Sequence, residues 1–185
     1  MKRSQAPLLC DLPAFNEKEN CLRAVIETPK GSPNKYDYDP KFGCFELAKT
    51  LPEGLTFPFD FGFVPSTKGE DGDPLDILVL MDFPAIMGCV VNVRLIGCLR
   101  AEQKEKGEDT VRNDRFVAVA QDSRTLSDVK SLADLRPGLL KEIKAFFVQY
   151  NKLAGKKFTP IGDCGAKRAL SLVKAGMRKA GKKRR

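Results

Sequence analysis

The sequence contains no histidine and no tryptophan among its 185 residues. Without histidine, neither a Ser-His-Asp nor a Cys-His catalytic site can form, and zinc sites with imidazole ligands are excluded. Acid–base chemistry therefore falls to aspartate, glutamate, lysine, tyrosine or a metal-bound water. The six cysteines are scattered without a Cys-x-x-Cys pair. This pattern favours reduced thiols and a cytoplasmic location over a disulfide framework.

Long apolar segments are also missing. No stretch approaches the length of a membrane-spanning helix, so we expect no membrane partner. The start of the chain, residues 1–7, lacks an apolar signal region, and we expect no secretory leader. The length suits a single domain over residues 1–185. We expect its folded body at residues 20–175 and a basic tail at residues 176–185.

The positive charge is concentrated at the C-terminal end. Residues 166–185 contain nine of the 32 Lys and Arg residues and no acid, which leaves 23 basic and 24 acidic residues elsewhere. The body of the chain is therefore close to neutral. The basic end is either a solvated helix end with a disordered tail, which is the commoner case, or a contact site for nucleic acid or another polyanion.

The most informative segment is residues 71–76, with the sequence DGDPLD, followed by the apolar run 77–80. Gly72 permits a tight turn, and Pro74 favours an extended conformation at the preceding residue. The turn gathers Asp71, Asp73 and Asp76 at the entrance of a predicted buried strand. Their mutual repulsion is relieved if a hard cation such as Mg²⁺ binds there. The alternative is an ordinary acidic turn, since Asp, Gly and Pro all form turns.

Strand patterns dominate the first two thirds of the chain. Residues 57–63 place a phenylalanine at every second position, which puts the four rings on one face of an extended segment. Such a stripe is more often part of a core than of a site. The short spacing of the predicted strands favours a barrel or a sandwich. The other predicted strands are 22–27, 77–80, 90–99 and 116–120, with a hairpin over 35–47.

Helical periodicity appears only near the C-terminus. Apolar residues recur at three- and four-residue steps between Leu139 and Leu153. We place Pro137 at the first helical position and Gly155 at the stop. A second helix is predicted over residues 165–177, and Gly176 weakens its end.

The chain resembles the soluble family I inorganic pyrophosphatases in four segments. These are DGDPLD at 71–76, FPFDFGF at 57–63, Glu27-Thr-Pro and Lys35-Tyr-Asp37. The similarity covers about residues 20–155, in matching order. It implies a mainly β, α+β fold: a five-stranded OB-like closed β-barrel with two C-terminal helices packed outside. It also implies hydrolysis of pyrophosphate, several Mg²⁺ ions per site with other divalent cations possible, and a homo-oligomer.

The resemblance also implies roles for individual residues. Asp71, Asp73 and Asp76 match metal ligands, and Asp73 additionally matches the group that helps to deprotonate the attacking water. Lys35 and Tyr150 match phosphate-binding residues that we count as catalytic. Asp37 joins the expected metal ligands, although a glutamate with a longer reach is usual there.

Several positions depart from the family pattern. Lys49 replaces an arginine and keeps its charge without the bidentate fork. Phe61 replaces a tyrosine and so lacks its hydroxyl. Asn151 replaces a lysine, and we expect Lys152 to bind substrate in its place.

By the same resemblance, the loop 102–112 is several residues longer than is usual in the family. Gln103 stands at the position of a metal-binding aspartate, so that Glu102, Glu105 or Asp109 can substitute. Arg115 matches a substrate-binding lysine. Asn113 occupies the position of a second aspartate, and we therefore expect Asp114 as the ligand. In a regular strand Asp114 would face away from Arg115, so this role requires a bulge.

Three hypotheses follow. The first is an Mg²⁺-dependent inorganic diphosphatase that acts through a metal-activated water. The second is a catalytically weak pyrophosphatase-like binding or scaffold protein whose basic tail contacts nucleic acid. The third is a phosphohydrolase for a different diphosphate.

Overall fold

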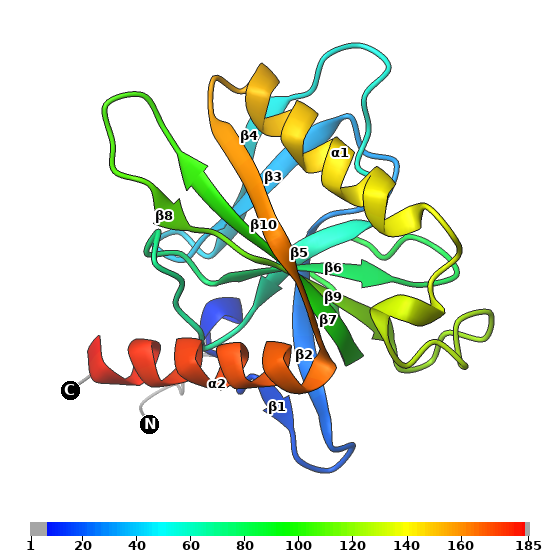
Figure 1. Ribbon diagram of the computed structural model, residues 1–185. Coiled ribbons are helices and arrows are strands. Elements are labelled where there is room, and N and C mark those ends of the chain that lie inside the picture. The colour runs from blue at the N-terminus through cyan, green and yellow to red at the C-terminus, as the bar shows by residue number, and fades with distance from the viewer. Residues whose placement is uncertain (1–6, 184–185) are drawn as a thin grey trace.

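The computed structural model describes residues 7–183 and shows a mainly β protein with two α-helices (Figure 1). Residues 1–6, where no leader is expected, and residues 184–185 of the predicted basic tail lie outside the described part. Within it, one sheet of eight strands forms the body, and a separate two-stranded sheet stands beside it.

Five strands of the larger sheet pair in a closed ring. The order β2-β5-β6-β9-β7 is closed by a further pairing between β7 and β2. All of these pairings are antiparallel except that of β6 with β9. The strands are β2 (Cys21–Thr28), β5 (Asp60–Val64), β6 (Leu75–Leu80), β7 (Val90–Lys104) and β9 (Arg115–Ala120).

The other strands extend or cover this ring. β3 (Asn34–Asp39) and β4 (Cys44–Thr50) form the predicted hairpin. β1 (Phe15–Asn16) pairs with β2, and β8 (Val111–Arg112) pairs with β7. β10 (Lys157–Gly165) pairs with β7 at the edge of the sheet and was not predicted. Its proline and glycines obscure the strand pattern but are tolerated in an edge strand.

Helix α1 (Leu139–Leu153) confirms the first helical prediction. It is followed by Gly155 with a positive φ of 75°, as expected of a stop. Pro137 is not its first residue, which was a wrong prediction, because Gly138 adopts a left-handed conformation between Pro137 and the helix. Two short 3₁₀ helices, η1 (Leu9–Asp11) and η2 (Leu132–Asp134), complete the connections.

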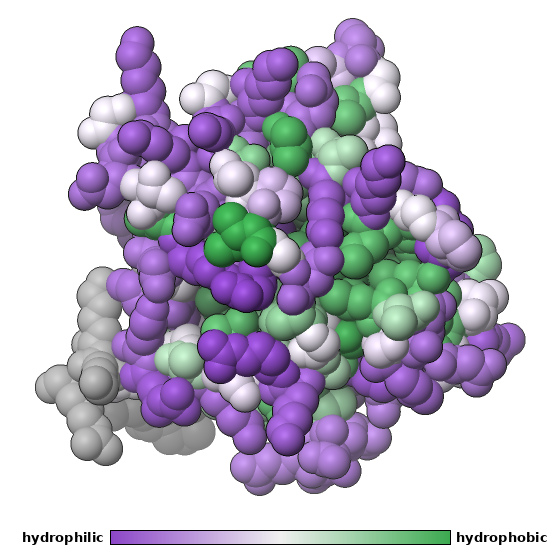
Figure 2. Space-filling model, in the orientation of Figure 1, coloured by the Kyte–Doolittle hydropathy of each residue, from purple (hydrophilic) through white to green (hydrophobic). Residues whose placement is uncertain are grey.

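Helix α2 (Ala166–Lys183) is longer than predicted and continues through Gly176. Its buried residues Ala169, Val173 and Gly176 recur at helical spacing along one side. Figure 1 shows α1 in the upper part of the view and α2 in the lower part, with the crossing of the ring strands between them. Exposed cations cover the opposite side of α2. These cations are Lys167, Arg168, Lys174, Arg178 and Lys179. Hydrophilic residues predominate over the lower part of Figure 2.

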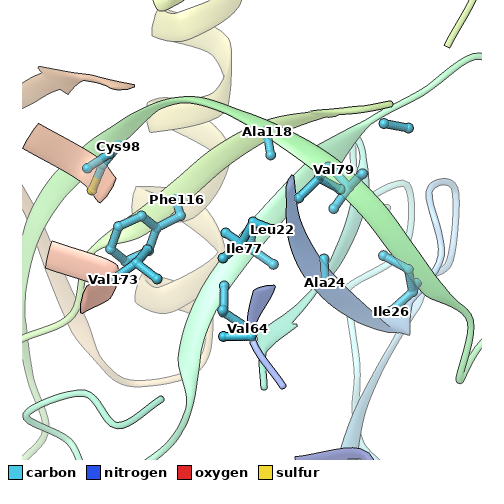
Figure 3. Close-up of a cluster of buried hydrophobic side chains, with 14 residues drawn as sticks. Leu22, Ala24, Ile26, Val64, Ile77, Val79, Cys98, Phe116, Ala118 and Val173 are labelled. Carbon is cyan, nitrogen blue, oxygen red and sulfur yellow. The ribbon is translucent and has the colours of Figure 1, made fainter. Parts of the chain in front are cut away.

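Two apolar clusters fill the interior, on opposite faces of the ring strands. Alternation along β6 places Ile77 in one cluster and Leu78 in the other. The first cluster joins the strands to Val173 of α2 and is shown in Figure 3. The second joins them to Phe147 of α1. Together they fix both helices to the ring.

Within residues 7–183, neither helix combines the length and the apolar character needed to cross a bilayer.

Candidate active site

A cavity of about 820 Å³ opens between the hairpin β3–β4, the turn before β6, the loop between β7 and β9, and the end of α1. Asp71, Asp73 and Asp76 contribute to one side of it. Lys35, Lys49, Arg115, Tyr150 and Lys156 also line it. Carboxylates and cations from distant parts of the sequence therefore share one space. We call residues 68–76 the acidic turn.

The acidic turn is organised by its own hydrogen bonds. The Gly69 amide donates to the Asp73 carbonyl at 2.7 Å, and the Asp73 amide donates to Asp71 Oδ1 at 3.2 Å. The Leu75 amide donates to Oγ1 of buried Thr67 at 3.0 Å. Gly72 has a φ of 97°, which glycine adopts without strain. The turn therefore holds its carboxylates at the entrance of β6 as the sequence predicted.

Burial and neighbouring charges make ionisation of Asp71 and Asp73 less favourable. Burial, followed by the charges of Asp76 and Asp73, raises the pKa of Asp71 to about 6. Burial and the charge of Asp76 likewise raise the pKa of Asp73. A divalent cation would remove this repulsion and has the oxygen ligands that it requires.

The donor chemistry therefore fits a hard cation, although the carboxylates do not converge on one point. Among residues 7–183, no three acidic or thiol side chains are arranged as a metal-binding group. Asp37 lines the cavity but is ion-paired with Lys35. The acidic turn thus supplies oxygen ligands, and its carboxylates would have to move together when a cation binds.

Lys35 lies deep on the cationic side. Its Nζ is 3.8 Å from Glu27 Oε2 and 5.3 Å from the centre of the Phe61 ring. Burial lowers the pKa of Lys35, and the nearby charges of Glu27 and Asp76 oppose this change. The ammonium group is therefore poorly hydrated, and in the structure it is ion-paired with Asp37.

Lys49 and Tyr150 lie together at the cavity wall. Lys49 Nζ is 5.4 Å from the centre of the Tyr150 ring. Burial and the charge of Lys156 lower the pKa of Lys49, whereas burial raises the pKa of Tyr150 to about 12. Tyr150 thus remains a neutral hydrogen-bond donor at ordinary pH. Its ring is held by contacts with Phe57 and Phe146.

Arg115 is the most enclosed cation of the site, with its side chain only 5% exposed. Its guanidinium lies 5.3 Å from the centre of the Phe147 ring and 5.2 Å from that of Phe158. Nη1 is 2.5 Å from Asp76 Oδ2, whereas the buried Nε has no hydrogen-bond partner. A buried donor without a partner is costly, and a phosphate oxygen could satisfy it.

Amides occupy the positions where the family pattern has aspartates. Asn113 Nδ2 donates to Gln103 Oε1, and Gln103 Nε2 donates to Glu105 Oε1, both at 3.3 Å. Glu105 also pairs with Lys156, and Arg115 donates to the Asn113 side chain. Because of these linked side chains, the net charge on this side of the cavity is neutral to positive. Of the three acids considered as substitutes for Gln103, Glu105 and Asp109 line the cavity and Glu102 does not.

Two expected site residues are placed elsewhere. Asp114 does not line the cavity; it accepts hydrogen bonds from Arg112 Nε at 2.5 Å and the Ala101 amide at 3.0 Å. Asp114 directly precedes β9, and β8 and β9 pair with β7 in one continuous register without a bulge between them, so Asp114 faces away from Arg115. Lys152 is exposed on α1 and also lies outside the cavity lining. Neither residue enters the site as the structure places it.

Lys156 is a cavity residue that the sequence did not reveal. The Gly155 turn ends α1 and returns the chain, and the Lys156 amide donates to the Asn151 carbonyl at 2.9 Å. The side chain of Asn151 is buried and donates to the Phe147 carbonyl at 2.8 Å. Lys156 thus reaches the cavity from the segment that follows α1. No sequence pattern predicted this position.

Glu27 is a buried acid that lines the cavity. Its Oε1 accepts from the Tyr38 amide at 2.9 Å, and burial raises its pKa to about 7 against the opposing charge of Lys35. The folded chain therefore retains this proton more strongly than the unfolded chain. The resulting stability is complete below pH 4.5 and is lost as the pH rises through about 7.

Glu27→Gln is expected to remove this pH dependence. The native chain should lose roughly 3 kcal/mol of unfolding free energy relative to Glu27→Gln as the pH rises through this range. Urea denaturation at a series of pH values measures the difference. The exposed Glu53→Gln variant serves as the control and should follow the native chain. Parallel curves for the native chain and Glu27→Gln would contradict the assignment.

Comparisons with known proteins agree with one another. A family model described as inorganic pyrophosphatase matches residues 24–180. The inorganic pyrophosphatase of Thermus thermophilus is 41% identical over 80% of this chain and 82% of its own. That of Synechocystis is 40% identical over 78% of this chain and 82% of its own.

Solved structures show the same similarity. The inorganic pyrophosphatase structure from Thermus thermophilus has a TM-score of 0.86 and 35% identity, covering 95% of this chain and 99% of its own. The structure from Neisseria gonorrhoeae has a TM-score of 0.82 and 28% identity, covering 92% of this chain and 96% of its own.

Proposed function

The chain belongs to the inorganic pyrophosphatase family, and on this premise we propose that it hydrolyses inorganic pyrophosphate to two phosphates with a divalent cation, preferably Mg²⁺. One observation carries the proposal: the acidic turn and a set of protein cations line the same cavity. Hydrolysis of a small polyphosphate requires both features. The cations neutralise the charge of the substrate, and the carboxylates can hold a metal ion that activates the attacking water.

Asp71, Asp73 and Asp76 are the proposed ligands of the cation. When bound, Mg²⁺ would neutralise phosphate oxygens and make a water nucleophilic at neutral pH. Asp73 would accept a proton from that water, because it lines the cavity beside Asp71 and Asp76. We propose Asp37 as an additional ligand, after release from Lys35.

The protein cations would hold the substrate. Lys35, Arg115 and Lys156 would bind phosphate oxygens, and Lys49 would add charge at the wall. The Tyr150 hydroxyl would donate a hydrogen bond to the leaving phosphate. As the bond between bridging oxygen and phosphorus breaks, these groups would stabilise the charge that develops on the departing oxygens.

The remaining expectations are part of the same proposal. We propose that the five-strand ring is an OB-like barrel, that the chain is a homo-oligomer, and that it works in the cytoplasm. Within the described residues, Cys21, Cys44, Cys89, Cys98 and Cys164 are free thiols, which agrees with a reducing environment. The relatives do not favour the alternative of a binding or scaffold protein that contacts nucleic acid through its basic end.

Metal removal tests the proposed function. Phosphate release from pyrophosphate should be rapid with Mg²⁺, fall to background with EDTA, and return when Mg²⁺ is added in excess. Nucleoside diphosphates and triphosphates, tested in parallel, should be much poorer substrates. Equal phosphate release with Mg²⁺ and with EDTA would exclude the proposal, and faster release from a nucleotide would favour a different diphosphate substrate.

A further inference from the structure

Helix α2 contacts the acidic turn directly, although it lies outside the cavity. The Lys68 amide, at the start of the turn, donates to the Gly176 carbonyl at 3.1 Å. Leu75, near the end of the turn, packs in the cluster that contains Val173 and Met177 of α2. The helix therefore holds the turn at both ends.

Gly176 makes this close approach possible. A Cβ atom added to Gly176 would lie 2.7 Å from Leu75 Cδ1, 3.2 Å from Leu75 Cγ and 3.4 Å from the Lys68 carbonyl oxygen. Leu75 lies between Asp73 and Asp76 in the sequence, so a displacement that reaches the Leu75 backbone would move these carboxylates. A glycine inside a helix is unfavourable relative to alanine, and the contact with Leu75 explains its presence here.

Besides the pairing of Asp76 with Arg115, Glu70 makes two weaker contacts between the turn and its surroundings. Lys179 Nζ lies 3.9 Å from Glu70 Oε1, with both side chains about half exposed. The amide of Arg112, in β8, donates to Glu70 Oε2 at 3.3 Å. Both of these contacts involve an exposed side chain, whereas Gly176 and Leu75 meet inside the protein.

We propose that Gly176 is a positioning residue for the proposed metal ligands. By admitting Leu75 and binding the Lys68 amide, it sets the place of Asp71, Asp73 and Asp76 relative to the cationic side of the cavity. The role in metal binding rests on the proposed function, whereas the effect of Gly176 on the position of the acidic turn does not depend on catalysis.

Gly176→Ala tests the inference, with Gly181→Ala as the matched control. Both replace a glycine of α2 by the better helix former, but a Cβ at Gly181 meets no atom within 4 Å. Hydrogen–deuterium exchange of the metal-free chain should be roughly tenfold faster over residues 67–76 in Gly176→Ala. Gly181→Ala should match the native chain. Unchanged exchange in Gly176→Ala, or equal changes in both variants, would overturn the proposal.

A second variant separates positioning from general damage to the fold. Leu75→Ala removes the same contact from the other side and should also speed exchange in the turn. In the double variant Leu75→Ala/Gly176→Ala, the new methyl group occupies space left by leucine, so exchange should return toward the native rate. Additive effects in the double variant would contradict a direct contact.

Metal affinity supplies the functional measurement. Calorimetric titration with Mg²⁺ alone, below the unfolding temperature of each variant, should show roughly tenfold weaker binding to Gly176→Ala and native binding to Gly181→Ala. Native affinity in Gly176→Ala would overturn the positioning role. If the native chain neither binds Mg²⁺ nor hydrolyses pyrophosphate, the proposed function fails, while the exchange measurements still decide whether Gly176 positions the turn.

Discussion

Replacing Asp73 with asparagine is expected to slow pyrophosphate hydrolysis about a thousandfold. The substitution keeps the size of the side chain and removes both the metal-binding charge and the proton acceptor. Because burial and the neighbouring Asp76 raise the pKa of Asp73, its loss should not weaken the fold. Turnover at saturating Mg²⁺ measures the first effect, and urea denaturation without metal measures the second.

The control for this prediction is Asp128→Asn, which makes the same chemical change at an exposed position outside the cavity. It should retain native turnover. If Asp73→Asn kept more than about a tenth of the native rate, Asp73 could not be both metal ligand and base. If Asp128→Asn were equally impaired, the loss would have no connection with the cavity.

Arg115→Ala is expected to reduce both stability and turnover. The substitution leaves Asp76 without its ion pair and empties the space between Phe147 and Phe158. Loss of one partner of a buried pair costs about 3 kcal/mol, and loss of a donor to the substrate costs about a hundredfold in rate. Urea denaturation and turnover on the same preparation measure the two effects.

Two further variants make this prediction specific. Arg115→Lys keeps the charge but not the planar fork, so it should recover part of the turnover and less of the stability. The exposed Arg124→Ala should resemble the native chain in both measurements. Full activity in Arg115→Ala would show that the guanidinium does not bind substrate.

The sequence predicted the strands that alternate or form continuous apolar runs, because burial against a core imposes these patterns. It did not predict β10, because Pro160 and Gly162 interrupt the pattern of this edge strand, which pairs with β7. The length of α2 was also underestimated. Gly176 indicated a weak helix end in the sequence, whereas in the structure it is a close contact with Leu75.

For the site, the sequence predicted the placement of residues that are close neighbours along the chain, while their roles as metal ligands stay a prediction. Asp71, Asp73 and Asp76 lie in one short turn whose conformation is set by neighbouring residues. Arg115 reaches the cavity by strand alternation, which also turns Asp114 away.

Prediction was less informative where the site depends on how the chain returns after a helix. Lys152 and Lys156 are separated by a single turn around Gly155, and only the folded chain distinguishes them. The amide chain through Gln103 and Asn113 likewise depends on a pairing between distant segments.

The central claim is that the acidic turn gathers divalent cations beside protein cations that hold phosphate. Crystals of the full chain soaked in Mn²⁺ and inorganic phosphate test it directly through the anomalous signal of manganese. We predict at least one Mn²⁺ bound by Asp71, Asp73 and Asp76, with phosphate against Lys35 and Arg115. Carboxylates that stay apart, with no anomalous peak between them, would contradict the account.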